Sequence, residues 1–164
     1  MTQIPYNILF ICTGNSARSI LAEALINHSG YENFRAWSAG SQPRGEIHPM
    51  TLTTLEHLHI PTNDLYSKSW DEFTTDNAPR FDFIITVCDK AAGEVCPVWP
   101  GTPITAHWGV PDPATEGPEA LQRFAFAEVA RVLKRRIDLF MALPLSKIDA
   151  MSLQHELRAI GQQT

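Results

Sequence analysis

An apolar strand that leads directly into a short loop and then a helix constrains this chain more than any other feature. The run Ile8–Ile11 predicts a buried strand, the segment Cys12–Ser19 (CTGNSARS) predicts a loop, and a helical pattern begins near Ala17. Such a loop turns successive backbone N–H groups inward, and the helix N-terminus adds partial positive charge. The spacing therefore predicts a cradle for a tetrahedral oxyanion around Cys12.

The side chains of this loop add a nucleophile and a guanidinium to the cradle. Arg18 offers a planar pair of donors to two oxyanion oxygens, and Ser19 can donate a hydrogen bond to the sulfur of Cys12. We expect the same positive field to lower the pKa of the Cys12 thiol. A free cysteine that ends a strand is often a small buried apolar residue, but a packed core has no use for Arg18 there. The predicted anion-binding residues are Thr13, Gly14, Asn15, Ser16, Ala17 and Arg18.

Composition limits the class of protein. The 164 residues are enough for one domain with a core, and 44% apolar and 19% charged residues are typical of a soluble globular protein. A net charge of −5 argues against a nucleic-acid or acidic-membrane partner, and we find no export signal and no apolar run near twenty residues. Three cysteines fit thiol chemistry better than a secreted disulfide scaffold, so we expect a cytoplasmic protein.

Predicted strands alternate with predicted helices along the chain. The strands fall at residues 6–11, 34–38, 81–87 and 103–106, and the helices at 17–29, from Pro49, from the Ser69–Glu72 capping box, at 118–141 and beyond Pro144. This alternation predicts an α/β fold: one doubly wound, four-stranded parallel sheet in the order 2-1-3-4, flanked by helices. The loop at Cys12 then lies at the topological switch point. We expect residues 1–142 to form the domain and residues 143–164 to add a C-terminal helix packed on it.

The long predicted helix carries an apolar face and a basic run. The basic run, Lys134-Arg135-Arg136, is expected to be solvated near the helix C-terminus, where the dipole favours cations. The residues expected to face inward are Leu121, Phe124, Ala125, Val129, Val132, Leu133, Ile137 and Phe140.

Two further cysteines follow the third predicted strand. Cys88 ends that strand as Cys12 ends the first, and neighbouring parallel strands lie about 4.8 Å apart, so both thiols are expected at one edge. Cys88 could then attack a group attached to Cys12. A helix between Cys88 and Cys96 would separate their Cα atoms by about 12 Å, so a bond between them requires that segment to loop. We favour a redox pair of Cys88 and Cys96 over two alternatives. In the first, Cys88 is a core residue and Cys96 has no special role. In the second, the two cysteines and His107 bind a metal ion.

A candidate general acid follows the fourth predicted strand. Asp112 lies on a proline-stiffened loop at the same edge of the sheet and could protonate a leaving oxygen. An aspartate before proline is also common in turns without any chemical role. The neighbouring His107 and Trp108 are expected to pack against the site rather than to react.

Together these residues resemble the low-molecular-weight protein tyrosine phosphatase fold family, in the branch that reduces arsenate. The resemblance covers roughly residues 8–141. It rests on Cys12–Ser19, on Trp37–Gly40, on Cys88 with Cys96-Pro97, and on His107–Gly109 with Asp112-Pro113.

The resemblance implies a relay of three thiols. Cys12 attacks arsenate while Asp112 protonates the departing oxygen, and Cys88 then attacks Cys12 and expels arsenite. Cys96 next attacks Cys88, and the resulting Cys88–Cys96 disulfide is reduced by thioredoxin. The sequence leaves a glutaredoxin–glutathione system open as the electron donor, although Cys96 favours thioredoxin.

The resemblance also bears on bound ions. Relatives of this reductase type can bind potassium. The positions that correspond here are Asn15, Glu23, Ser38 and Asp71. No obligatory cofactor and no catalytic metal are expected.

Phosphomonoester hydrolysis and non-enzymatic anion sensing are two other functions that the loop at Cys12 allows. The chain could hydrolyse phosphomonoesters through a thiophosphate on Cys12, and some phosphatase activity is expected because phosphate and arsenate are nearly isosteric. Phosphatases of this fold usually carry an aromatic residue after the Asp-Pro pair, where Ala114 stands here, and they need no additional thiols. A non-enzymatic anion-sensing module is the third possibility, against which the set of Cys12, Arg18 and Asp112 argues.

Overall fold

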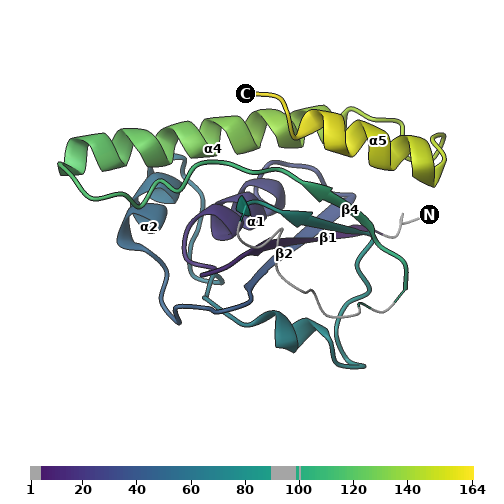
Figure 1. Ribbon diagram of the computed structural model, residues 1–164, viewed down its shortest axis with the longest axis horizontal. Helices are drawn as coiled ribbons and strands as arrows, with labels where there is room; N and C mark the ends of the chain where they lie inside the picture. Colours follow the sequence, from purple (N-terminus) through teal and green to yellow (C-terminus); the bar gives the residue numbers. More distant parts are fainter. Residues whose placement is uncertain (1–4, 90–98, 100) are drawn as a thin grey trace.

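The computed structural model describes residues 5–89, 99 and 101–164. Four parallel strands form one sheet in the order β2-β1-β3-β4, which confirms the predicted topology (Figure 1). The strands are β1 (Tyr6–Cys12), β2 (Phe34–Gly40), β3 (Phe83–Thr86) and β4 (Ile104–His107). The predicted α/β class, with strands and helices alternating along the chain, is confirmed as well.

The central strand β1 places the predicted loop at the carboxyl edge of the sheet. Ile8–Ile11 of β1 are completely buried, as expected for a strand covered on both faces of a parallel sheet. Cys12 pairs in register with Gly40 of β2, and Thr86 of β3 pairs with His107 of β4. The carboxyl ends of all four strands therefore meet at one edge, where the loops that follow them can share a site.

Helices cover the sheet. They are α1 (Arg18–Asn27), α2 (Pro49–His57), the short 3₁₀ helix η1 (Trp70–Phe73), α4 (Glu119–Met141) and α5 (Ala150–Ile160). Pro49 occupies the first turn of α2 as predicted, and the imidazole of His48 accepts a hydrogen bond from the N–H of Met50. After a loop at the end of α4, the last helix, α5, runs back in the opposite direction and packs against β4 (Figure 1). Within the described ranges, no helix is long and apolar enough to cross a membrane.

Two predictions for α4 are wrong. Leu121 and Phe124 are 66% and 70% exposed, because the N-terminal part of α4 runs past the ends of the strands and has no sheet to cover (Figure 1). Arg136, expected in solvent, is only 3% exposed. The predicted capping box at η1 is half formed: the hydroxyl of Ser69 accepts from the N–H of Asp71, while the carboxylate of Glu72 accepts from Tyr66.

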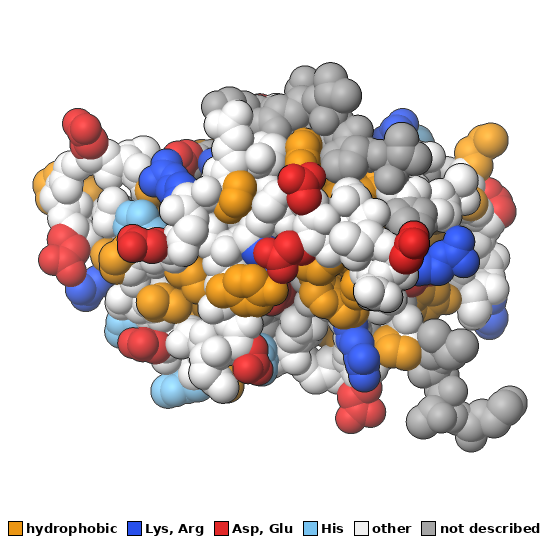
Figure 2. All heavy atoms as spheres, turned by 90° about the horizontal axis from the view of Figure 1, so that it is seen from below, with side chains coloured by type: hydrophobic (Ala, Val, Ile, Leu, Met, Phe, Trp, Pro, Cys, Tyr) orange, Lys and Arg blue, Asp and Glu red, His pale blue; other side chains and the backbone are white. Residues whose placement is uncertain are grey.

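The surface turned away from α4 and α5 carries a mixture of side chains. Acidic and basic groups are interspersed there around a band of apolar side chains (Figure 2). Such mixing of signs is typical of an ordinary solvated protein surface.

Candidate active site

The loop between β1 and α1 has the form expected for an anion cradle. The carbonyl oxygens of Thr13, Gly14 and Ser16 accept hydrogen bonds from the backbone N–H groups of residues 42, 44 and 48. These carbonyls point away from the loop interior, and Ala17 caps α1 without a side-chain acceptor, so the amides of the first turn remain available to an anion. The loop borders a cavity of about 330 Å³.

That cavity brings most of the predicted site residues together. Cys12, Thr13, Gly14, Asn15, Ser16, Ala17, Arg18, Cys88 and Asp112 line it. Arg44, Gln42 and Ala114 line it as well. Sequence reasoning missed Arg44, which lies in the loop after β2 and carries no local pattern that would distinguish it from a surface arginine. Cys96 lies outside the residues that the structure describes.

The buried side chain of Asn15 holds the anion loop in shape through its hydrogen bonds. Its φ of +44° is in the left-handed region, which asparagine tolerates better than most residues, and its side chain is fully buried. The amide nitrogen donates to the hydroxyls of Ser19 (2.8 Å) and Ser38 (3.0 Å), while its oxygen accepts from the N–H of Lys68 (2.9 Å). Ser19, whose hydroxyl oxygen accepts from Asn15, keeps its own hydrogen for a second partner.

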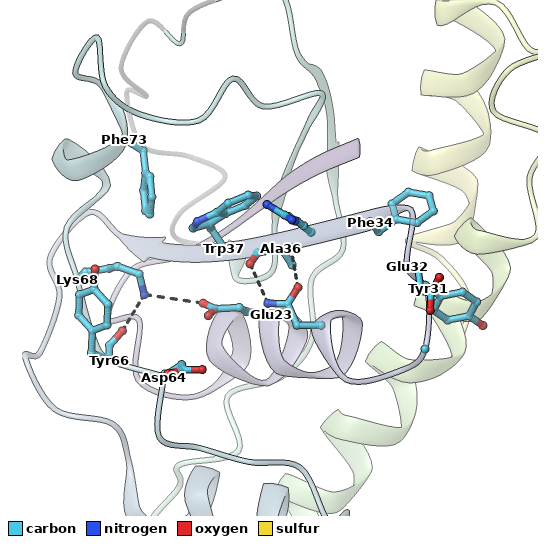
Figure 3. A pocket seen from close by; sticks show the side chains of 13 residues that line it. Glu23, Tyr31, Glu32, Phe34, Ala36, Trp37, Asp64, Tyr66, Lys68 and Phe73 are labelled. Carbon is cyan, nitrogen blue, oxygen red and sulfur yellow. Dashed lines mark hydrogen bonds and ion pairs between the residues drawn. The ribbon is translucent and has the colours of Figure 1, made fainter. Parts of the chain in front are cut away.

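A buried ion pair continues this network away from the cavity (Figure 3). The hydroxyl of Ser38 donates to Glu23 at 2.5 Å, and the ammonium of Lys68 lies 3.8 Å from the same carboxylate oxygen. Lys68 also donates to the carbonyl of Tyr66 and lies over its ring. Burial raises the pKa of Glu23 and lowers the pKa of Lys68, and each charge partly offsets the shift of the other.

This pair bears on the predicted potassium site. The structure brings Asn15, Glu23 and Ser38 together as predicted, but the cation beside Glu23 is the ammonium of Lys68. The adjoining cavity of about 610 Å³ is lined by Asp64 rather than by Asp71, whose side chain is exposed on η1. The predicted potassium site therefore has no support, because the chain supplies the positive charge itself.

Cys12 and Cys88 lie close together at the edge of the sheet. Both are buried free thiols, both line the anion cavity, and the ionisation of Cys12 is coupled to Cys88. The N–H of Thr13 donates to the sulfur of Cys88 at 3.3 Å, and the hydroxyl of Thr13 lies 3.6 Å from it. The predicted meeting of these two thiols at the carboxyl edge of the sheet is therefore found.

The electrostatics of Cys12 differ from the prediction. The hydrogen bond with Cys88 and burial raise the pKa of the Cys12 thiol well above its ordinary value, while the positive charge of Arg18 lowers it. Two adjoining thiols cannot both lose their protons cheaply, because the second negative charge would form beside the first. The expected fall in the pKa of Cys12 is thus opposed by a neighbour that the loop motif alone does not reveal.

Asp112 combines the two interpretations that its sequence context allowed. Its side chain is exposed, and one carboxylate oxygen accepts from the N–H of Ala114 at 3.0 Å, as in an aspartate turn. It also lines the cavity that Cys12 and Arg18 line. The guanidinium of Arg18 donates to the carbonyl of Val110 at 3.1 Å, which ties the loop of Asp112 to the anion loop.

His107 and Trp108 lie at the end of β4, where the loop that carries Asp112 begins. One imidazole nitrogen of His107 is 2.7 Å from the hydroxyl of Thr86, and the other is 2.8 Å from a carboxylate oxygen of Asp89. Trp108 is completely buried and packs against Phe10 and Phe140. These positions agree with the expectation that both residues pack near the site.

Known proteins are similar to this chain in sequence and in fold. The family model described as low molecular weight phosphotyrosine protein phosphatase matches residues 7–156. A protein from Shouchella clausii named arsenate reductase is 33% identical over 134 residues, which cover 81% of this chain and 93% of that protein. An arsenate reductase from Bacillus subtilis is 30% identical over 76% of this chain and 86% of that protein.

Solved structures give the same result. A thioredoxin-dependent arsenate reductase from Corynebacterium glutamicum superposes with a TM-score of 0.61 at 31% identity, over 89% of this chain. This chain spans 65% of the length of that protein. An arsenate reductase from Archaeoglobus fulgidus superposes with a TM-score of 0.60 at 28% identity, over 80% of this chain and 98% of that one. The chain therefore belongs to the low molecular weight phosphotyrosine protein phosphatase family.

Proposed function

We propose that the protein reduces arsenate to arsenite, with Cys12 as nucleophile and electrons supplied by thiols. The position of two free thiols, Cys12 and Cys88, in the wall of the same anion cavity carries this proposal. Ester hydrolysis needs one nucleophilic sulfur, whereas a two-electron reduction needs a second thiol within reach of the first. The relatives named arsenate reductase support the same choice.

In the first step, the Cys12 thiolate attacks arsenic. The As–O bond breaks as the S–As bond forms, and the departing hydroxide leaves as water with a proton from Asp112. The loop amides and Arg18 hold the remaining oxygens and offset their negative charge. Because Cys88 raises the pKa of Cys12, the positive charges of Arg18 and of the helix N-terminus have to favour the thiolate at Cys12.

In the second step, the Cys88 thiolate attacks the sulfur of Cys12. The S–As bond breaks, its electron pair stays on arsenic, and arsenic passes from the +5 to the +3 state while the two sulfurs form a disulfide. Cys96 then attacks Cys88, so that Cys12 leaves as a thiolate and a Cys88–Cys96 disulfide remains. A dithiol protein of the thioredoxin type returns this disulfide to two thiols and is itself oxidised.

The proposal extends to the partner and the compartment. The similarity to a thioredoxin-dependent enzyme supports thioredoxin as the reductant, with glutaredoxin and glutathione as the alternative. Two buried cysteines kept as free thiols fit the reducing cytoplasm, which we propose as the location.

Thioredoxin-dependent formation of arsenite by the purified chain tests the function. Cys12→Ser should abolish all activity. Cys88→Ser should abolish arsenite formation but leave hydrolysis of a small aryl phosphate, because that reaction uses the anion loop, Cys12 and Asp112 but no second thiol. Cys96→Ser should release one arsenite per molecule and stop at the Cys12–Cys88 disulfide, which mass spectrometry can identify.

Two outcomes would overturn the proposal. Equal loss of both activities in Cys88→Ser would remove the second thiol from the redox step. Vigorous hydrolysis of aryl phosphates without arsenite formation by the unmodified chain would assign the site to phosphomonoesters instead.

A further inference from the structure

The loop that carries Asp112 is held from behind by a buried arginine. Arg136, on α4, donates from one guanidinium nitrogen to the carbonyls of Trp108 (2.8 Å) and Gly109 (3.2 Å). A second nitrogen donates to the carbonyl of Gln163 at 2.9 Å. All three hydrogen bonds end on backbone carbonyls. Arg136 therefore joins the start of the loop that carries Asp112 (residues 108–114, the acid loop) to the segment after α5.

Holding this cation in the interior is costly. Arg136 is 3% exposed, and burial lowers the pKa of its guanidinium. Among the residues that the structure describes, carbonyl dipoles rather than a carboxylate offset the loss of water around Arg136. A planar side chain with several donors can reach carbonyls on two segments at once. A role in general packing would be met more cheaply by an apolar side chain, so the geometry points to the backbone that Arg136 fixes.

The helix α5 closes the same arrangement. The indole N–H of Trp108 donates to the carbonyl of Leu157 at 3.0 Å, and both residues are completely buried. At Gly161 the backbone approaches so closely that a Cβ atom would lie 2.4 Å from the carbonyl oxygen of His107. The path from β4 into the acid loop is therefore confined by α4 and α5 together (Figure 1).

Arg18 and Arg136 thus donate hydrogen bonds to the acid loop from opposite sides. Arg18 reaches the carbonyl of Val110 from the anion cavity, and Arg136 reaches the carbonyls of the two preceding residues from the interior. Asp112 follows after a single proline, so it has little freedom of its own relative to these anchors. A shift of the anchored carbonyls would move the carboxyl group relative to Cys12.

We propose that Arg136 is a positioning residue for the reaction: it holds the backbone of Trp108 and Gly109 so that Asp112 faces the anion cavity. This inference rests on the proposed role of Asp112 as the general acid. Arg136 does not line the anion cavity: its hydrogen bonds to the acid loop end on backbone carbonyls, and on the far side of that loop it lines a second cavity, of about 300 Å³, together with Asp112.

A double-mutant cycle between Arg136→Met and Asp112→Asn tests the inference. We expect Arg136→Met to lower kcat for arsenite formation roughly 10- to 100-fold, with KM for arsenate changed less than about twofold, because the anion loop is left in place. In the Asp112→Asn background the same substitution should have almost no further effect, since no acid remains to be positioned. Arg135→Met, the adjacent exposed arginine, is the matched control and should leave the rate unchanged.

The possible outcomes separate this inference from the proposed function. Multiplication of the two single effects in the double variant, or a rise in KM with kcat preserved, would overturn the positioning role alone. An unchanged rate in Asp112→Asn would overturn the role of Asp112 and with it the basis of the inference. If Arg136→Met does not fold, Arg136→Lys completes the cycle, because it keeps the charge but cannot reach all three carbonyls.

Discussion

The ammonium nitrogen of Lys68 lies 3.8 Å from a carboxylate oxygen of Glu23, and the two side chains are only 4% and 11% exposed. Hydrogen bonds through Ser38 and Asn15 connect this pair to the anion loop. The pair therefore links the charge balance of the interior to the geometry of the site. Because burial raises the pKa of Glu23, the contribution of this carboxyl group to stability falls as the pH rises.

Lys68→Met should leave the Glu23 carboxylate buried without its cation. Breaking a buried pair from one side costs about 3–5 kcal/mol, which we expect as the loss of unfolding free energy at pH 7. Lys68 lowers the pKa of Glu23, so its removal raises that pKa further. A carboxyl group whose pKa is raised by folding stabilises the fold at pH values below its pKa in the unfolded chain. This contribution is lost as the pH rises through its pKa in the folded protein.

The deficit of Lys68→Met relative to the unmodified protein should therefore be larger at pH 7 than near pH 4. Urea denaturation at the two pH values measures it. The double variant Lys68→Met/Glu23→Gln, which removes both charges, should recover part of the loss at pH 7, and its deficit should be no larger at pH 7 than near pH 4, because the unmodified protein itself loses the contribution of Glu23 as pH rises. A deficit of equal size at both pH values in the single variant would mean that Glu23 is not the responsible group.

Catalysis should be indifferent to potassium. The position beside Glu23 already holds the ammonium of Lys68, so an external monovalent cation has no charge to complete there. Exchange of sodium for potassium at constant ionic strength should leave the rate of arsenite formation unchanged. A selective increase with potassium would show that a cation binds at this network despite Lys68.

Cys88→Ala should make Cys12 more acidic. The hydrogen bond with Cys88 and the charge on Cys88 both raise the pKa of Cys12, so removing the second sulfur should lower it. The rate of alkylation of Cys12 by iodoacetamide, followed by mass spectrometry of its peptide, should then reach half its maximum at a lower pH. Arg18→Ala should move this midpoint upward, because Arg18 lowers the pKa. Shifts in the same direction for both variants would contradict the assignment.

Gly40→Ala should deform the anion loop. A Cβ atom at this position would lie 2.5 Å from the carbonyl oxygen of Thr13 and 3.0 Å from that of Cys12, and backbone atoms cannot move aside cheaply. We expect the affinity for inorganic phosphate, measured by calorimetry, to fall about tenfold or more.

Ser41→Ala is the matched control for Gly40→Ala. Its buried hydroxyl has no hydrogen-bond partner among the residues that the structure describes. Removing an unsatisfied hydroxyl should leave phosphate affinity unchanged and stability equal or slightly higher. An equal loss of affinity in both variants would show that the segment after β2, rather than the contact of Gly40, is sensitive.

Local sequence patterns were sufficient for the sheet and for most of the cavity. Alternating strands and helices indicate a doubly wound parallel sheet, for which 2-1-3-4 is the flavodoxin-like order, and the loop after β1 follows from its own composition. Patterns failed where a partner is far away in the sequence. Periodicity identifies the apolar face of α4, but it does not show that the sheet ends before Leu121 and Phe124.

The same limit applies to charge. A basic run on a helix is ordinarily solvated, and nothing near Arg136 in the sequence indicates the carbonyls that it meets. The pairing of Lys68 with Glu23 brings together two distant segments, neither of which has an unusual composition. The pKa of Cys12 depends on Cys88, which follows β3 and is distant in the sequence, so the loop motif alone predicts the wrong direction.

The packing of α5 has a consequence beyond the site. Strand β4 is the last in the sheet, and since the N–H of Ile104 points toward β3, the carbonyl of Thr105 points outward. The side-chain amide of Gln154 on α5 donates to that carbonyl at 3.3 Å. An outer strand left bare is a template on which a second molecule can extend the sheet. The helix thus protects the molecule from self-association, and a chain shortened before residue 150 should aggregate as it folds.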